Sequence, residues 1–211
     1  TLVLKDTVGY TGDAGGDDTG EVRWDPTGRF LITGEEDDSD PNNCVYPLYE
    51  FNRVDETLDL IPNSIIEYDW GINNAFDWTT IRWFPSGDKF AILGRVINEL
   101  QFFNFSGMPL QQKSEMNLNY GTYANSAKWH STNNYVAGGG EDPTDGNELK
   151  VFKFDSNNKL TILTGCNLSL GSYAVNTIDW SPDGMLLAVG TDEAWQYPLK
   201  VYRFNRQSSL C

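Results

Sequence analysis

One pattern occurs four times in this chain of 211 residues, and it constrains the fold more than any other feature. Each occurrence has an apolar residue, a variable residue and a tryptophan, followed by a turn segment and an apolar run that ends in glycine. The tryptophan segments are Val22–Gly28, Ile81–Gly87, Ala127–Asn133 and Ile178–Gly184. A period of roughly 45–60 residues indicates an array of similar structural units.

Every part of this unit predicts β-structure. Ile178 and Trp180 alternate with polar residues, which places both on one face of a strand. The Pro-x-Gly that follows favours a tight turn. The apolar run Leu186–Val189 is typical of a strand buried on both faces, and Leu199–Phe204 is rich in aromatic and β-branched residues. No window shows a helical stripe, so we predict an all-β chain.

Turn, buried strand, loop, aromatic strand and a weaker closing strand are the parts of a propeller blade. The chain resembles the WD-repeat (WD40-like) β-propellers, most clearly in Ile178–Gly190. It lacks the Gly-His pair before each tryptophan strand, and endings with Phe replace the Trp-Asp pair, so we expect aromatic packing instead of that polar network. The resemblance implies a single domain, 1–211, of four WD-like blades. Their approximate limits are 12–61, 71–113, 121–164, and 171–211 plus 1–8.

The two ends of the chain suggest how the ring closes. Thr1–Leu4 matches the closing strand Leu160–Leu163, and the chain stops shortly after the strand that ends at Phe204. We therefore expect the N-terminal strand to complete the last blade, which leaves no exposed sheet edge. Two alternatives stay open: half of an eight-bladed ring formed by a dimer, or an excerpt of a longer array.

Charge and cysteine content exclude several classes of protein. Fifteen Lys and Arg oppose 30 Asp and Glu, and a net charge of −15 argues against nucleic acid and membrane surfaces as partners. No apolar run approaches the ~18–20 residues of a membrane span. Cys44, Cys166 and Cys211 contain no Cys-x-x-Cys, which excludes a zinc knuckle but allows one bridge and a free thiol. The cellular compartment stays open.

The loops, where the repeats differ most, are predicted to carry the function. They combine acidic residues with tryptophan and tyrosine outside the repeat register, whereas the four repeat tryptophans are expected in the core. A basic surface is expected on the partner. The candidate contact residues are Glu35, Glu36, Asp37, Asp38, Trp70, Trp78, Asp142, Asp145, Asp192, Trp195 and Tyr197.

Metal binding and catalysis have weaker support. Asp13, Asp17 and Asp18 supply the oxygen ligands that calcium prefers, but without the spacing that surrounds one ion, so solvated acidic loops are the simpler interpretation and no cofactor is expected. His130 is the only histidine, it follows a strand at a turn, and no nucleophilic triad has visible members. We therefore predict that the chain is not an enzyme.

These observations favour a non-catalytic scaffold for protein–protein interaction, a role that the WD-repeat resemblance also implies. One alternative is a carbohydrate-binding, lectin-like propeller in which Trp70, Trp78 or Trp195 stacks on sugars. Another is a structural subunit of a larger assembly. A homodimer is compatible with each of them.

Overall fold

The structure of the chain is a computed structural model. It describes residues 2–8, 19–36, 43–69, 80–93, 100–105, 111–112, 123–132, 134–141, 145–154, 159–163, 165–171, 173–193 and 198–205. Within these ranges every regular element is a β-strand, which confirms the all-β prediction. None of these residues belongs to a helix that is long and apolar enough to cross a membrane.

The first antiparallel sheet, sheet 1, has six strands because two long strands are each interrupted. The strands are β1 (Thr19–Trp24), β2 (Phe30–Glu36), β3 (Asn43–Tyr46), β4 (Leu48–Asn52), β5 (Thr57–Leu60) and β6 (Ile66–Asp69). β2 pairs with β1 on one side and with β3 and β4 on the other. Pro47, which has no N–H to donate, separates β3 from β4, while its carbonyl accepts the Thr33 amide at 3.2 Å.

The other three sheets have the meander order of a propeller blade, with sequence neighbours paired antiparallel. Sheet 2 contains β7 (Thr80–Trp83), β8 (Lys89–Leu93), β9 (Leu100–Asn104) and β10 (Gln111–Gln112). Sheet 3 contains β11 (Tyr123–Trp129), β12 (Tyr135–Glu141), β13 (Leu149–Phe154) and β14 (Leu160–Ile162). Sheet 4 contains β15 (Val175–Trp180), β16 (Leu186–Thr191) and β17 (Leu199–Arg203).

The residue after each repeat tryptophan decides how the following turn is held. Asp25 accepts main-chain amides at 2.7 and 2.8 Å, His130 Nδ1 accepts one at 3.1 Å and Ser181 Oγ accepts one at 2.9 Å. Phe84 instead packs on Trp129, with ring centroids 3.6 Å apart. The same turn is therefore built from unlike side chains, which explains why this position varies between the repeats.

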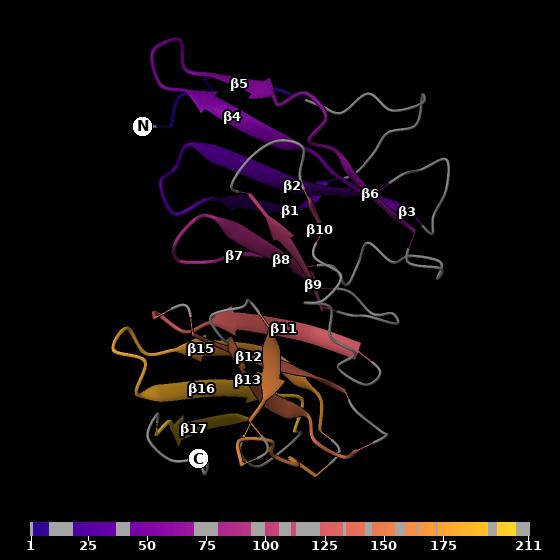
Figure 1. Cartoon of the computed structure of the whole chain (residues 1–211), viewed down its shortest axis with the longest axis vertical. Coiled ribbons are helices and arrows are strands. Elements are labelled where there is room, and N and C mark those ends of the chain that lie inside the picture. Colours follow the sequence, from indigo (N-terminus) through magenta and orange to yellow (C-terminus); the bar gives the residue numbers. More distant parts are fainter. Residues whose placement is uncertain are drawn as a thin grey trace.

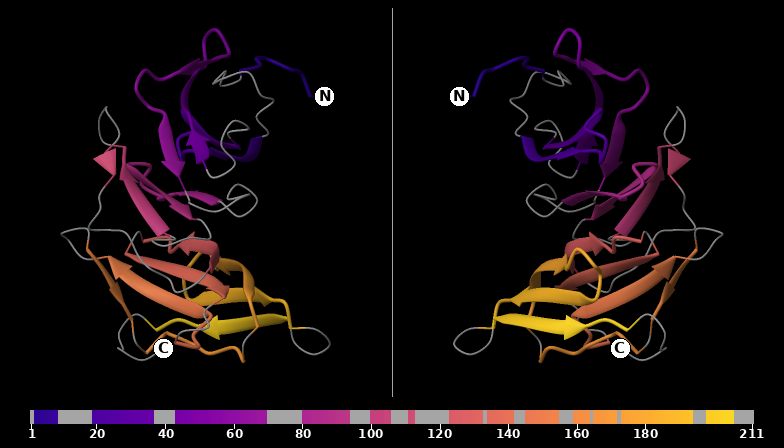
Figure 2. Two further views of the ribbon diagram at one scale, coloured as in Figure 1. Left: turned by 90° about the vertical axis from the view of Figure 1, so that its right-hand side faces the viewer. Right: turned by 90° about the vertical axis from the view of Figure 1, so that its left-hand side faces the viewer.

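The sheets follow one another in chain order along an open arc (Figures 1 and 2). Sheet 1 packs on sheet 2 through β1 and β7, sheet 2 on sheet 3 through β7, β8 and β11, and sheet 3 on sheet 4 through β11, β12 and β15. We call the contact between two neighbouring sheets a seam, and each seam has its own cluster of buried apolar side chains. Residues 2–8 and β17 lie at opposite ends of the arc, and the described strands do not form a closed ring (Figure 1).

The expected closure by the N-terminal strand is wrong in this structure. Residues 2–8 form no strand and lie against the hairpin of β4 and β5 in sheet 1, far from β17 (Figure 1). Lys5 forms an ion pair with Glu56 at 2.5 Å, and Asp6 accepts the Leu58 amide at 2.8 Å. The apolar side chain of Leu2 is fully exposed. Polar contacts with sheet 1 therefore hold this segment, instead of strand pairing with sheet 4.

The repeat tryptophans join neighbouring sheets. Three of the four repeat tryptophans are buried. The indole Nε1 of each buried tryptophan donates to a main-chain carbonyl in the preceding sheet. This carbonyl belongs to the residue just before the repeat tryptophan of that sheet. The pairs are Trp83 to Arg23, Trp129 to Arg82 and Trp180 to Lys128, at 3.3, 3.3 and 3.0 Å. The prediction that all four lie in the core is wrong for Trp24, which is 47% exposed, because no described sheet precedes sheet 1.

Candidate functional site

The side chains that precede the repeat tryptophans form a row across the inner strands of three sheets. Arg23 on β1, Arg82 on β7 and Lys128 on β11 line one cleft of about 400 Å³. We call it the turn-rim cleft, and the described residues that line it are Arg23, Trp24, Pro26, Arg82, Trp83, Pro85, Lys128 and Trp129. One repeat position supplies all three cations, so the stacking of sheets brings together residues that are distant in the sequence.

Glu21 anchors the arginines of this cleft. Its carboxylate forms ion pairs with Arg23 and, at 2.8 Å, with Arg82, and it also accepts the amide of Ile81 from the neighbouring sheet. Arg82 Nε donates in turn to the Ala127 carbonyl at 3.2 Å. Arg82 therefore bridges three consecutive sheets, and this structural role fixes its position at the centre of the cleft.

Lys128 and Arg23 are the cations that solvent and a ligand can reach. Their side chains are 46% and 42% exposed, whereas Arg82 is largely covered. Lys128 lies 3.2 Å from the carboxylate of Asp179 on sheet 4. Three cations thus face two carboxylates, those of Glu21 and Asp179, within a chain of net charge −15. Tryptophan and arginine are among the residue types enriched at the energetic centres of protein interfaces.

The turn that carries Pro26 into the cleft is held by Asp25. The hydroxyl of Thr27 donates to the Asp25 carboxylate at 2.5 Å, and the amides of Thr27, Arg29 and Phe30 donate to it as well. Burial acts to raise the pKa of Asp25, but these hydrogen bonds outweigh burial and hold the pKa below its ordinary value. Asp25 is therefore a structural carboxylate that stays ionised at neutral pH.

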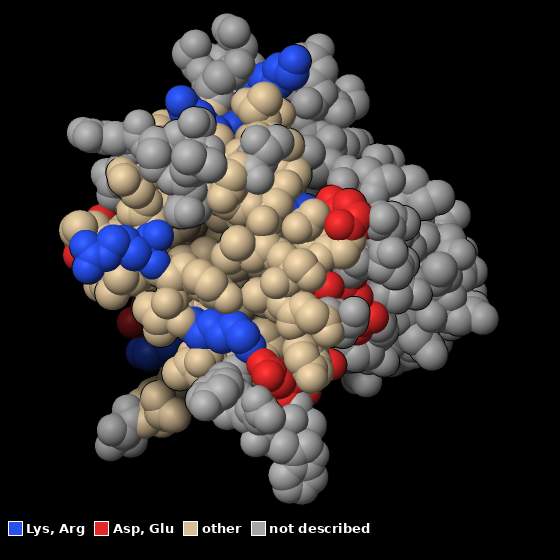
Figure 3. Space-filling view, turned by 90° about the horizontal axis from the view of Figure 1, so that it is seen from below, with Lys and Arg blue, Asp and Glu red and all other residues tan. Residues whose placement is uncertain are grey.

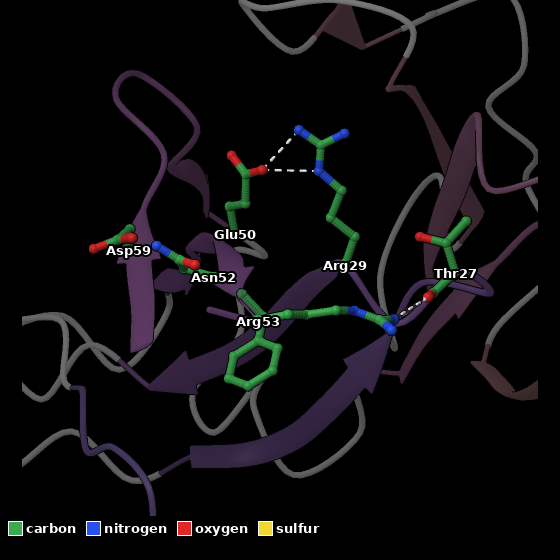
Figure 4. A pocket seen from close by; sticks show the side chains of 7 residues that line it. Thr27, Arg29, Glu50, Asn52, Arg53 and Asp59 are labelled. Carbon is green, nitrogen blue, oxygen red and sulfur yellow. Dashed lines mark hydrogen bonds and ion pairs between the residues drawn. The ribbon is translucent and has the colours of Figure 1, made fainter. Parts of the chain in front are cut away.

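A second cavity, of about 620 Å³, opens beside β4 in sheet 1. Its lining is Thr27, Arg29, Glu50, Phe51, Asn52, Arg53 and Asp59. Figure 4 shows Arg29 turned toward Glu50, with nitrogen–oxygen distances of 2.7 and 2.8 Å, and Arg53 extended to the Thr27 carbonyl at 2.8 Å. Both arginines thus tie β4 to the turn between β1 and β2, which gives this cavity a structural interpretation.

Most predicted loop contacts lie outside the described residues and stay predictions. These are Asp37, Asp38, Trp70, Trp78, Asp142, Trp195 and Tyr197, together with the calcium candidates Asp13, Asp17 and Asp18. Within the described part of the chain, no group of three or more His, Cys, Asp or Glu is placed to hold a metal ion. Cys166 is buried and disulfide-bonded.

The predicted contact residues that the structure describes do not form one patch. Asp192 is exposed just after β16, and Glu36 is the last residue of β2. Asp145 is partly exposed and forms an ion pair with Lys150 at 3.1 Å. Glu35 is buried, so its prediction as a surface contact is wrong. The assignment of Asp192, Asp145 and Glu36 as contact residues stays a prediction.

Glu35 belongs to the interior of sheet 1. The hydroxyl of Thr33 donates to its carboxylate at 2.6 Å. Burial, with a smaller contribution from the Glu35 charge, raises the pKa of Tyr49 to about 12. Strand alternation places Thr33 and Glu35 on one face of β2, and the packing that covers this face buries the carboxylate.

His130 connects sheet 3 to sheet 4. Its Nε2 donates to the Gly184 carbonyl at 3.0 Å, while Nδ1 accepts the Thr132 amide. Its ring is fully buried and meets Trp180 edge to face, with centroids 5.0 Å apart. These contacts give the histidine a structural role at the seam.

The cations of the turn-rim cleft were not among the contact residues predicted from the sequence. The signal was present, because Arg23, Arg82 and Lys128 precede three of the four repeat tryptophans in a chain with twice as many acidic as basic residues. The predicted contacts lie in the loops, where the repeats differ, whereas these cations occupy a position that three repeats share.

Part of the chain matches a known repeat family directly. Residues 158–194, which span β14 to β16, match the model of the WD domain, G-beta repeat. The chain carries a WD40 repeat. The resemblance to WD-repeat propellers is thereby confirmed, although the sequence has no match among curated proteins.

Solved structures show the same fold. The C-terminal WD40 domain of Sif2 matches with a TM-score of 0.59 and 14% identity, over 91% of this chain and 47% of that one. The periplasmic gluconolactonase PpgL of Pseudomonas aeruginosa matches with a TM-score of 0.67 and 15% identity, over 90% of this chain and 51% of that one. A protein of Bacteroides uniformis assigned as a 6-phosphogluconolactonase matches with a TM-score of 0.66 and 11% identity, over 92% of this chain and 52% of that one. The chain thus spans about half the length of these structures, which are β-propellers like this one.

These matches correct the prediction that the chain is not an enzyme. The prediction depends on the absence of catalytic motifs and on a fold associated with binding, yet gluconolactonases share that fold. Identities of 11–15% show the fold alone and assign no activity to this chain.

Proposed function

We propose that the chain is a protein-interaction propeller that binds its partner at the turn-rim cleft. WD40 propellers generally bind protein partners, which supports the class of function. The observation that carries the proposal is the lining of the cleft, where three tryptophans, two arginines, a lysine and two prolines meet on one concave surface. Trp24, Arg23 and Lys128 are about half exposed and supply contact area and charge-assisted hydrogen bonds, whereas Trp83 and Trp129 are largely buried and support them.

The partner's chemistry follows from the exposed groups of the cleft. The half-exposed indole of Trp24 suits an apolar or aromatic side chain, and Arg23 and Lys128 suit a carboxylate or main-chain carbonyls. The remainder of the partner's surface is proposed to be basic, because the chain's net charge of −15 attracts such a surface at long range. The exposed Asp192 lies on the opposite, loop-bearing rim, here called the loop rim, and is not assigned to this contact.

Site-specific photocross-linking tests the location of the contact. A photoreactive phenylalanine analogue is placed at Pro85 in the cleft, at Asp192 on the loop rim, and at the exposed Val54 in the β4–β5 turn as control. The proposal expects the cross-linked product from a native extract to be strongest at position 85. Cross-linking at position 192 alone would place the contact on the loop rim, and equal labelling at all three positions would refute a specific site.

Alanine variants then test the cations with the partner so identified. Lys128→Ala and Arg23→Ala are each expected to weaken binding roughly tenfold, because a charge-assisted hydrogen bond is lost. Arg53→Ala removes an arginine outside the cleft and serves as the matched control. Unchanged affinity in both cleft variants would refute the assignment of this cleft.

The carbohydrate alternative depends on Trp70, Trp78 and Trp195, which lie outside the described residues. Glycan-array binding that is lost in Trp195→Ala, while partner binding at the cleft persists, would separate the two functions.

A further inference from the structure

The last sheet of the arc exposes side chains whose equivalents are buried at the seam before it. On β13, Leu149 and Val151 pack against sheet 4 and are buried. Leu199 and Val201 occupy the same register positions on β17, opposite Gly190 and Ala188 of β16. They are 68% and 59% exposed. Sheet 4 thus ends in a surface that has the chemistry of an inter-sheet seam but no described neighbour.

The described part of this end face is uncharged over its middle. Figure 3 looks onto the end of the arc that sheet 4 forms, and a continuous area of uncharged residues crosses it, with most Lys, Arg, Asp and Glu around that area. Leu186, another exposed apolar residue of β16, belongs to the same face as Val201. Exposed apolar areas of this kind mark interaction surfaces in soluble proteins.

The first sheet of the arc exposes the opposite half of such a seam. Val22 and Trp24 alternate on one face of β1 and are both about half exposed. Their equivalents, Ile178 and Trp180 on β15, are buried against Leu149 and its neighbours in sheet 3. One copy of the chain therefore carries an unmatched tryptophan face and an unmatched leucine–valine face.

The charges beside these two faces are complementary. At the seam of sheets 3 and 4, Lys128 and Asp179, which both precede a repeat tryptophan, form an ion pair at 3.2 Å. The same repeat position holds Arg23 in sheet 1, so sheet 1 placed upon sheet 4 of another copy brings Arg23 beside Asp179. The indole of Trp24 then lies beside the Asp179 carbonyl, as Trp180 lies beside that of Lys128. Packing, hydrogen bonding and charge agree on the same arrangement.

We propose that two copies of the chain associate head to tail, with sheet 1 of each copy seated on sheet 4 of the other. Each copy offers one face of each kind, so two equal seams use every face and close a ring, whereas one seam alone would permit open-ended growth. Arg23 and Trp24 also line the turn-rim cleft, so the seam and a partner bound at the cleft compete for these two side chains. Leu199 and Val201 lie outside the cleft, so variants at these positions test the seam alone.

The mass in solution tests the association. Light scattering after size exclusion is expected to give about 47 kDa, twice the 23.7 kDa of one chain, without growth as the loading concentration rises. A mass of one chain at every concentration up to the millimolar range overturns the proposal. A mass that climbs past two copies with concentration also overturns it, because the faces would then pair without closing.

A matched pair of variants tests the sheet 4 face. Val201→Glu places a charge in the proposed seam and is expected to give the mass of a single chain, since a buried unpaired carboxylate opposes association. Val54→Glu adds the same charge at a fully exposed turn and is expected to leave the dimer intact. The circular dichroism spectrum shows that each variant is folded. A folded Val201→Glu chain that remains dimeric overturns the assignment of this face.

Charge reversal tests the pairing without altering the apolar faces. Asp179→Arg and Arg23→Asp each create like charges at both seams, and each variant alone is expected to dissociate at least about tenfold more readily. An equimolar mixture of the two variants is expected to recover the dimer, because both seams of a mixed pair again join opposite charges. Failure of the mixture to recover, with both chains folded, would refute the contact between Arg23 and Asp179.

Discussion

The close approach of sheets 3 and 4 at Gly139 supports a sharp prediction about stability. A Cβ at this glycine would lie 2.2 Å from Val175 Cγ1, 2.7 Å from Ile178 Cδ1 and 2.8 Å from Val175 Cβ. Because Val175 Cβ is fixed to the backbone of β15, a rotamer change cannot relieve the overlap, and the seam must widen. Overpacking of this kind costs roughly 1–3 kcal/mol, so Gly139→Ala is expected to lower the free energy of unfolding by about that amount.

Gly34→Ala is the matched control. Gly34 holds the equivalent position on β2, where an added Cβ would meet Tyr46 Cε1 at 3.3 Å and Ile81 Cδ1 at 3.6 Å. The entropy that alanine removes from the unfolded chain, about 0.4–1 kcal/mol, roughly offsets so mild a contact. In thermal unfolding, Gly139→Ala is expected to melt about 2–10 °C below Gly34→Ala for a chain of this size. Equal melting temperatures, or a more stable Gly139→Ala chain, would refute this account of the seam.

Three further predictions concern the turns and seams. Gly184→Ala is expected to lower the free energy of unfolding in urea clearly more than Gly146→Ala. Both glycines have φ near +69°, so both substitutions strain the backbone equally. Only a Cβ at Gly184 would meet a neighbour, because it would overlap the His130 ring. Asp25→Asn is expected to lower stability at pH 7 by about 1–2 kcal/mol. Because folding lowers the pKa of Asp25, its contribution is complete above the unfolded pKa of about 3.9 and is lost as the pH falls through the lower folded value. Urea titrations of wild type and variant should therefore converge as the pH falls below that folded value. Trp180→Phe removes the 3.0 Å hydrogen bond to the Lys128 carbonyl and should cost about 1 kcal/mol or more, measured in the same titration; no loss would show that this bond does not hold the seam.

The strands and turns could be predicted because their causes are local. Alternation of Ile178 and Trp180 sets a strand face, and a proline followed by a positive-φ glycine such as Gly184 sets a turn. These signals depend only on residues close in the chain. The inward direction of Glu35 depends instead on the burial of that face of β2 beside Tyr49, which no local signal contains.

The sequence by itself therefore determined the repeating unit, its β-structure and the register of the tryptophans, because each of these follows from short-range sterics and the period of apolar residues. Only the tertiary structure decided that Leu2–Leu4 do not close the ring, that Trp24 is exposed while Trp180 is buried, and that Arg23, Arg82 and Lys128 share one cleft. These outcomes depend on which sheet face has a neighbour, and the same residue pattern is buried or exposed according to what packs against it.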